Sequence, residues 1–329
     1  MSFEAPSFDA DKIVDRRILR RKLTFWRVLG ILAAIIAIGA IALMAIPGGR
    51  EAFSGTSIAR VKIEGLIRSN EDRVAALEKL GKSNAPAVIV HINSPGGTTA
   101  GSEQLHEALL RLKEKKPLVV VVDGLAASGG YIAALSADHI IAQRSALVGS
   151  IGVLVQFPNF GELLKTVGVK VEEVKSSPLK AAPNGYEPTS PEARAALEAI
   201  VKDSYAWFRE LVKSRRKMDD ATLARVADGR VFTGRQSIDL KLVDELGDEK
   251  TALAWLAKEK NINPDTPVKN YPLTSKIGEF SVFKLAALGL EFAGLGSLAR
   301  AIDAHGVAQS VEAAGMDGVL ALWRPASGQ

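Results

Sequence analysis

The sequence of 329 residues contains no cysteine, which excludes disulfides, thiolate catalysis and cysteine-bound zinc. It also has no HExxH, Walker A or GxGxxG pattern, and no acidic cluster that would suggest a metal. We therefore expect neither a metal nor a cofactor.

Over most of the chain there is little excess of one sign of charge over the other, although the formal net charge is +5. Much of that excess lies in a basic leader, residues 1–27, and the rest of the chain is nearly balanced. We read this basicity as a membrane signal and expect no nucleic acid partner. The basic residues of the leader are Lys12, Arg16, Arg17, Arg20, Arg21, Lys22 and Arg27.

Residues 28–46 form the one long run without charge, VLGILAAIIAIGAIALMAI. As a helix it would span roughly 28 Å, close to the thickness of a bilayer core. The positive-inside rule places the leader in the cytoplasm. We expect a single-pass protein of the inner (cytoplasmic) membrane with its bulk on the outer, periplasmic side. A cleaved signal peptide ending near residues 40–42 and a buried core helix are the alternatives.

The next part of the chain predicts a βαβ pattern with a parallel sheet. A strand is expected at 57–67 from its alternating, β-branched pattern, and buried strands at 87–92 and 117–122. Helices are expected at 101–115 and 128–137. In such sheets, ligands bind beyond the carboxyl ends of the strands, where two Gly-rich turns of this chain lie.

Further along, 139–155 and 169–174 look like strands, and 176–190 reads as a loop rich in Pro, Ser and Asn. Helices are expected at 191–217 and at 250–261. The pattern predicts a domain over 57–272.

Residues 273–329 are a C-terminal extension of unknown role. Within it, residues 280–323 are apolar and Gly-rich, but charges interrupt them and no stretch is long enough to span a bilayer. It could be an amphipathic helix on a partner or a membrane surface, or an extension packed on the domain or loosely ordered.

Ser128 is the first candidate for chemistry, because AASGG (126–130) follows a buried strand and opens a helix. A serine there can project as in a nucleophile elbow, and the N–H of Gly129 at a helix N-terminus favours an oxyanion. The glycine beyond it would let a substrate backbone approach. The alternative is an ordinary helix N-cap serine.

A second turn, NSPGG (93–97), ends the neighbouring strand. Gly96 and Gly97 could present backbone N–H groups to a carbonyl oxygen. Together the two turns make an oxyanion hole plausible, although either one alone would be read as a simple turn.

A serine nucleophile needs a base, and the chain offers only four histidines: His91, His106, His139 and His305. None lies in a loop with catalytic neighbours, so a Ser–His–Asp triad is unsupported. A lysine serves as a base where an apolar pocket lowers its pKa from about 10.4 to about 7. Lys180 suits this role, because apolar residues flank it and no carboxylate adjoins it, although a solvated surface lysine is the ordinary reading.

Two further segments have weaker signals. Ser150, in GSIG (149–152), could orient the lysine or line the site, or be a strand serine beside a bulge. Residues 228–234 look like a structural turn braced by an arginine.

Taken together, these motifs resemble the signal peptide peptidase A family. No single motif is specific, but their order and spacing are. They are NSPGG (93–97), DGLAASGGYIAA (123–134), GSIGV (149–153), KSSPLK (175–180), DGRVFTGRQ (228–236) and LVDELG (242–247).

The resemblance implies an α/β fold, a crotonase- or Clp-protease-like spiral of ββα units behind one transmembrane helix. It maps the nucleophile to Ser128 and the general base to Lys180. The oxyanion region maps to Gly129, Gly96 and Gly97, and Ser150 and Tyr131 are expected to line the site.

The function that the resemblance implies is a membrane-anchored serine endopeptidase that hydrolyses apolar peptides, in particular remnants of signal peptides. Long family members carry two tandem copies and this chain carries one, as in short members where a ring brings the serine of one subunit to the lysine of its neighbour. We therefore expect a homo-oligomer with a shared active site. Another membrane serine protease of the Clp class, a crotonase-like enzyme acting on acyl thioesters and a non-catalytic scaffold are the competing hypotheses.

Overall fold

The computed structural model describes residues 25–27, 56–273 and 320–322. The predicted membrane segment 28–46 and most of the predicted extension 273–329 lie outside these ranges. Within them, no helix combines the length and apolar character needed to cross a bilayer. The chain divides after Ser54 into two units, and the second unit, Gly55–Gln329, carries the sheet.

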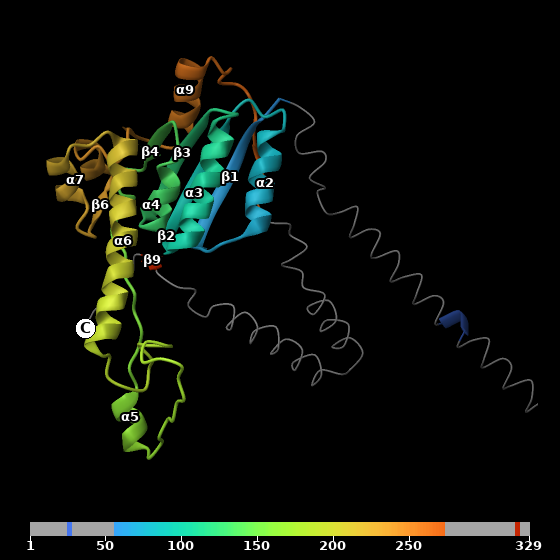
Figure 1. Ribbon diagram of the computed structural model, residues 1–329. Helices are drawn as coiled ribbons and strands as arrows, with labels where there is room; N and C mark the ends of the chain where they lie inside the picture. Colours follow the sequence, from blue (N-terminus) through green and yellow to red (C-terminus); the bar gives the residue numbers. More distant parts are fainter. Residues whose placement is uncertain (1–24, 28–55, 274–319, 323–329) are drawn as a thin grey trace, which may run out of the picture. The chain divides into compact units, whose positions relative to one another are not determined.

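The first half of this unit alternates strands and helices, as the βαβ pattern predicts (Figure 1). The predicted elements are all present, but β2 runs six residues and β3 five residues further than expected, through the turns. Helix α2, which Asn70 caps, was not predicted. The elements are β1 (Ile58–Ile67), α2 (Glu71–Gly81), β2 (Val88–Thr98), α3 (Thr99–Lys113), β3 (Leu118–Ala127) and α4 (Gly129–Ala134).

The second half is built of shorter pieces. Helices at 191–216 and 249–260 confirm two predictions. The elements are β4 (His139–Ala142), β5 (Leu147–Gly149), α5 (Gly161–Thr166), α6 (Pro191–Arg216), α7 (Asp220–Val226), β6 (Val231–Thr233), α8 (Gly234–Asp239), β7 (Glu245–Leu246), α9 (Glu249–Lys260), β8 (Val268–Asn270) and β9 (Leu320–Leu322).

Among the described residues, the strands form one mainly parallel sheet with the order β6-β5-β3-β2-β1-β8. Strand β4 pairs with the first part of β3 and with β7, while β5 pairs with the last part of β3. Two pairs are antiparallel, β5 with β6 and β2 with β9. The sheet confirms the α/β class.

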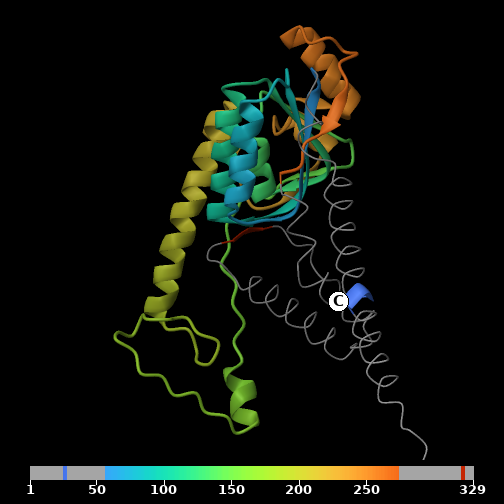
Figure 2. The ribbon, with the colours of Figure 1, turned by 90° about the vertical axis from the view of Figure 1, so that its right-hand side faces the viewer.

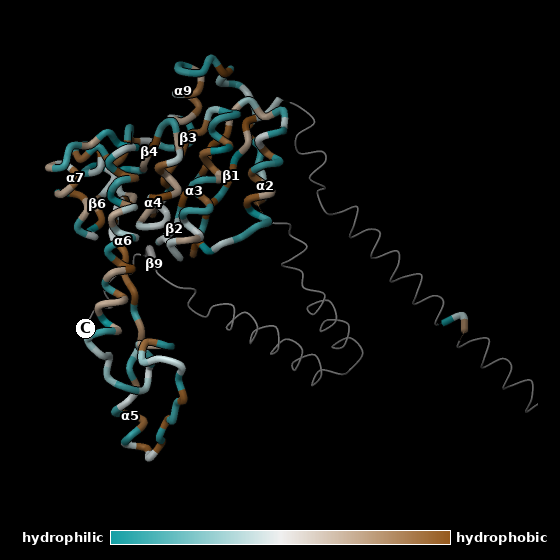
Figure 3. Tube along the Cα trace, in the orientation of Figure 1, coloured by the Kyte–Doolittle hydropathy of each residue, from teal (hydrophilic) through white to brown (hydrophobic). Residues whose placement is uncertain are grey.

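Both faces of the sheet are covered. Helices α2, α3 and α4 lie over one face (Figure 2), and α9 packs on the other through Ala252 and Leu256. Because parallel strands are buried on both sides, they are almost continuously apolar, as their brown colour in Figure 3 shows. Residues 118–122 of β3 are completely buried.

Two strand predictions were wrong in detail. The predicted strand 139–155 is two strands, because a turn at Gln143–Ala146 moves the chain from the first to the second part of β3. Residues 169–174 form no strand, since they lie on a segment, 153–190, that leaves the sheet and carries α5 (Figure 1). No described strand is near enough to pair with them there.

Candidate active site

Ser128 stands at the junction between β3 and α4 in a strained backbone conformation. Its φ of 54° and ψ of −116° lie in a region that non-glycine residues rarely adopt. Its N–H donates to the carbonyl of Gly149 at 2.7 Å, which fixes this turn. A strand–turn–helix with a strained serine is the geometry of a nucleophile elbow.

The side chain of Ser128 does not cap α4. A capping serine has an extended backbone and accepts an N–H from the first turn, and Ser128 does neither. The residue is 1% exposed, and among the described residues its hydroxyl donates only to the Gly152 carbonyl, at 3.5 Å. The hydroxyl is therefore free of any strong hydrogen bond that would hold it back from a substrate.

Gly129 and Gly130 have different roles at the start of α4. As the first residue of the helix, Gly129 has no acceptor for its N–H in a preceding turn, so this group can serve an oxyanion. A Cβ on Gly130 would lie 2.7 Å from the carbonyl oxygen of Ser94. The glycine at 130 therefore serves the packing of α4 on β2, not the approach of a substrate as its sequence suggested.

Ser94 organises the second Gly-rich turn, a role that was not predicted for this serine. Its hydroxyl donates to the Gly65 carbonyl at 2.6 Å and accepts the N–H of Gly96 at 3.1 Å. The Gly96 N–H thus has a partner in this state, while Gly97 packs directly on Ile67. A serine two residues before a glycine is a known turn signal and could have been read as one.

The turn at 149–152 holds Ser128 from the other side. Gly149 supplies the acceptor for the Ser128 N–H, and Ser150 has a φ of 52° and donates its own N–H to Arg230 at 2.8 Å. Ser150 is buried beside this turn. Arg230 pairs with Asp228 at 2.6 Å, which confirms the structural reading of residues 228–234.

Tyr131, which was expected to line the site, is completely buried. Its hydroxyl donates to the Leu242 carbonyl at 2.8 Å, and burial raises the pKa of the phenol. The side chain therefore anchors α4 to the loop before β7 and does not face a substrate.

Lys180 lies on segment 153–190 and is exposed. Its backbone N–H donates to Ser177 at 3.1 Å, and its side chain forms no hydrogen bond or ion pair with any described residue. Within one chain, nothing among the described residues brings Lys180 to Ser128.

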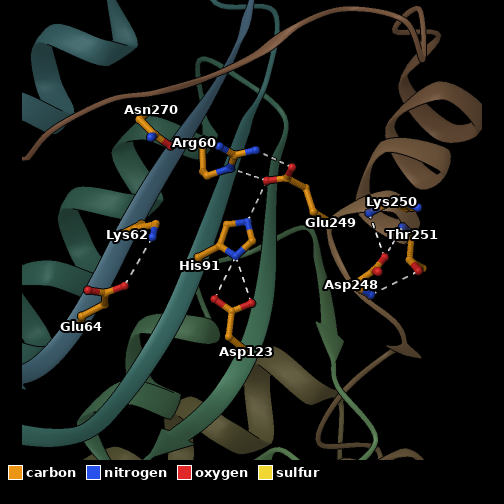
Figure 4. A network of polar contacts seen from close by, with 10 residues as sticks. All are labelled: Arg60, Lys62, Glu64, His91, Asp123, Asp248, Glu249, Lys250, Thr251 and Asn270. Atoms are coloured by element: carbon orange, nitrogen blue, oxygen red, sulfur yellow. Dashed lines mark hydrogen bonds and ion pairs between the residues drawn. The ribbon is translucent and has the colours of Figure 1, made fainter.

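The described histidines are engaged elsewhere. Figure 4 shows His91 between the carboxylates of Asp123, at 2.9 Å, and Glu249, at 2.9 Å. The Arg60 guanidinium, which also binds Glu249, holds the pKa of this carboxyl below its usual range. This network joins the start of α9 to the sheet. The described part of the chain has no group of three acidic, His or Cys residues placed to hold a metal.

His106 is buried against α4, the helix that follows Ser128. Its Nδ1 donates to the Ile132 carbonyl at 2.8 Å, and its Nε2 has no partner among the described residues. Desolvation by burial lowers its pKa from 6.5 to about 4. In the pH interval between these values the unfolded chain binds the proton and the folded chain does not.

Stability should therefore fall as the pH drops below 6.5. Between pH 7 and pH 5 we expect the free energy of unfolding to decrease by about 2 kcal/mol through His106. His106→Asn keeps a donor near Ile132 but does not titrate. The free energy of unfolding of this variant should therefore decrease by about 2 kcal/mol less than that of the wild type between pH 7 and pH 5. Pulse proteolysis in urea at both pH values measures this, and equal losses in the two proteins would contradict it.

The fold and site together define an α/β protein with a strained, buried serine at the carboxyl ends of parallel strands. The family model of peptidase family S49 matches residues 110–263. A predicted protease of Synechocystis sp. is 36% identical over 210 residues, which cover 63% of this chain and 76% of that protein. The chain belongs to peptidase family S49.

Two further similarities were found. A predicted signal peptide peptidase of Enterococcus faecium is 30% identical over 203 residues, which cover 61% of this chain and 59% of that protein. A ClpP1 mutant from Listeria monocytogenes superposes with a TM-score of 0.39 and 16% identity, over 57% of this chain and 91% of the other. At that TM-score, the fold assignment depends on the sheet topology of this chain alone.

Proposed function

We propose that this S49 peptidase is a membrane-anchored serine endopeptidase in which Ser128 is the nucleophile and Lys180 of a neighbouring subunit is the base. The observation that carries the proposal is the strained turn at Ser128, whose buried hydroxyl is neither a helix cap nor strongly hydrogen-bonded. Strain of this kind costs about 1–3 kcal/mol and is kept mainly at functional sites.

The reaction is acyl transfer to water. An uncharged Lys180 amine takes the proton of the Ser128 hydroxyl as Oγ forms a bond with the scissile carbonyl carbon. The N–H of Gly129 stabilises the oxyanion, and the Gly96 N–H can join it after leaving Ser94. The C–N bond then breaks as the Lys180 ammonium protonates the leaving amine, and water hydrolyses the acyl-serine to restore the hydroxyl.

A second copy of the chain is the proposed source of the lysine. Segment 153–190 extends from the sheet and exposes apolar side chains that a neighbour could cover, among them Phe160, Leu163 and Val174. Lys180 lies on the same segment and has no described partner. An oligomer built through this segment would place the lysine of one subunit at the serine of the next. We propose a crotonase-like spiral for the fold of each subunit.

We propose apolar peptides, in particular remnants of signal peptides, as substrates. Residues 28–46 would anchor the chain in the inner membrane, with the leader in the cytoplasm and the catalytic unit on the periplasmic side. The enzyme would then meet such peptides where they are released into the bilayer.

Mass spectrometry of a panel of synthetic signal peptides tests this proposal. The wild-type chain in detergent should cut the apolar segments and react at Ser128 with a fluorophosphonate, which a thioester enzyme without a nucleophilic serine would not do. Ser128→Ala should yield no products, and Ser136→Ala, a buried serine eight positions along the chain, is the matched control. Unchanged product patterns in Ser128→Ala would refute the proposal.

A further inference from the structure

The C-terminal part of α6 holds this long helix to the rest of the unit. Phe208 and Val212, both in this part, are completely buried, whereas no residue from 194 to 203 is buried. Figure 2 shows α6, in yellow, extending beyond the sheet toward segment 153–190. From Phe208 back to Pro191 the helix spans about 26 Å. A tilt of about 10° at the held end would therefore move the other end, next to this segment, by about 5 Å.

Arg215 joins the held end of α6 to the helix that begins after Ser128. Its Nε donates to the Leu135 carbonyl at 2.7 Å. Its Nη2 donates to the carbonyls of Ser136 and Ala137, each at 3.3 Å. These carbonyls lie at the C-terminal end of α4, where carbonyls lack partners within the helix and a cation is favoured. Arg215 therefore fixes α6 against α4.

Arg216 joins the same end of α6 to the loop before β7. Its guanidinium donates twice to the Asp244 carboxylate, at 2.7 and 3.2 Å, and its Nε donates to the Lys241 carbonyl at 2.7 Å. Burial acts to raise the pKa of Asp244, but the Arg216 guanidinium holds this pKa below its usual range. The same loop accepts the Tyr131 hydroxyl of α4 at the Leu242 carbonyl. The two arginines thus hold α6 on α4 and on the loop that also holds α4.

We propose that Arg215 and Arg216 are positioning residues of the peptidase, which fix the angle of α6 and thereby the place of Lys180. The proposal rests on the proposed role of Lys180 as the base. A guanidinium suits this task because its rigid, planar fork binds acceptors in one orientation, whereas the ammonium of a lysine is a point charge on a flexible stem. In the proposed assembly, the arginines of one subunit would act on the active site of its neighbour, because the lysine that they position reaches that site.

Distances between two spin labels test whether the arginines fix α6. Since the chain has no cysteine, Ala196→Cys on α6 and Glu103→Cys on α3, both exposed, can be labelled specifically. Double electron–electron resonance, with unlabelled subunits in excess, reports the distance within one chain. The distribution of distances should be about twice as wide in Arg215→Gln/Arg216→Gln as in the wild type. Arg194→Gln, at an exposed arginine of the same helix, should keep the wild-type width. Equal widths in all three chains would overturn the proposal.

Kinetics test whether the angle of α6 matters for catalysis. Arg216→Gln should hydrolyse a fluorogenic apolar peptide with a kcat about tenfold lower and an unchanged KM, because the lysine is in place for a smaller fraction of the time. The kcat of Arg216→Lys, which keeps a charge and a donor, should lie between these two values, and Arg194→Gln should match the wild type. Circular dichroism at the assay temperature verifies that each variant is folded. A wild-type kcat in Arg216→Gln would contradict the proposed role.

Mixed oligomers show on which subunit Arg216 acts. When Ser128→Ala and Lys180→Ala subunits are combined, Arg216→Gln in the Ser128→Ala chain, which supplies the lysine, should lower the restored kcat about tenfold. The same substitution in the Lys180→Ala chain, which supplies the serine, should have no effect. The reverse pattern, or equal losses, would overturn the proposal, because Arg216 would then support Ser128 of its own chain. If the mixture without Arg216→Gln is inactive, the intermolecular base of the proposed function fails, while the spin-label distances still decide whether the arginines fix α6.

Discussion

Oligomers that mix Ser128→Ala subunits with Lys180→Ala subunits should hydrolyse peptides, although each variant alone should be inactive. In the proposed assembly, the intact serine of a Lys180→Ala subunit meets the intact lysine of a Ser128→Ala neighbour. Random mixing in equal amounts makes about a quarter of such sites complete, so about a quarter of the wild-type rate should return. Co-expression with two different affinity tags, tandem purification and a peptide-hydrolysis assay measure this.

The control for this experiment comes from the same segment. Lys170 is also an exposed lysine on 153–190, ten positions before Lys180. Lys170→Ala should keep activity by itself, and mixing it with Ser128→Ala should dilute activity rather than restore it. If mixed Ser128→Ala and Lys180→Ala oligomers stay inactive while each variant still assembles, the two residues would have to act from one subunit, and the intermolecular base would be refuted.

The sequence predicted the parts of the fold that local apolar patterns determine. Strands β2 and β3 begin as short apolar runs that end in Gly-rich turns, and those runs are the buried centre of the sheet. Pairing between distant segments was harder to predict. Residues 139–155 look like one strand because both halves of this range are apolar. The break between β4 and β5 is seen only in their pairing, since β4 pairs with the first part of β3 and β5 with the last part.

The candidate site shows the same division. The motif around Ser128 predicts the strand–turn–helix, because local glycines and a preceding buried strand determine it. The direction of the Tyr131 side chain depends on a carbonyl 111 positions away, and the partner of the Gly96 N–H depends on how Ser94 rotates within the fold. Neither contact leaves a periodic signal in the sequence. An active site shared between subunits leaves even less signal in the sequence, because its two halves come from different chains.

Gly130→Ala should strongly reduce activity by displacing Ser128, the proposed nucleophile. The new methyl group would lie 2.7 Å from the backbone oxygen of Ser94 and 3.3 Å from its Cβ, and neither a backbone oxygen nor its strand can easily move away. The start of α4 must therefore shift away from β2, and Ser128 and Gly129 shift with it. A displacement of about 1 Å at reacting groups can cost on the order of a hundredfold in rate, and overpacking costs about 1–3 kcal/mol of stability.

Gly124→Ala provides the matched control for this loss. Gly124 lies on β3 four residues before Ser128, and the nearest atom to its added methyl would be the side-chain oxygen of Asn93, at 3.1 Å. That side chain can rotate away, so both stability and activity should stay close to wild type. The rate of fluorophosphonate labelling at Ser128 and the midpoint of thermal unfolding, measured for both variants, separate the effects. Labelling of Gly130→Ala at the wild-type rate would show that α4 tolerates the methyl group, and the close packing of α4 on Ser94 would then not be what positions the nucleophile.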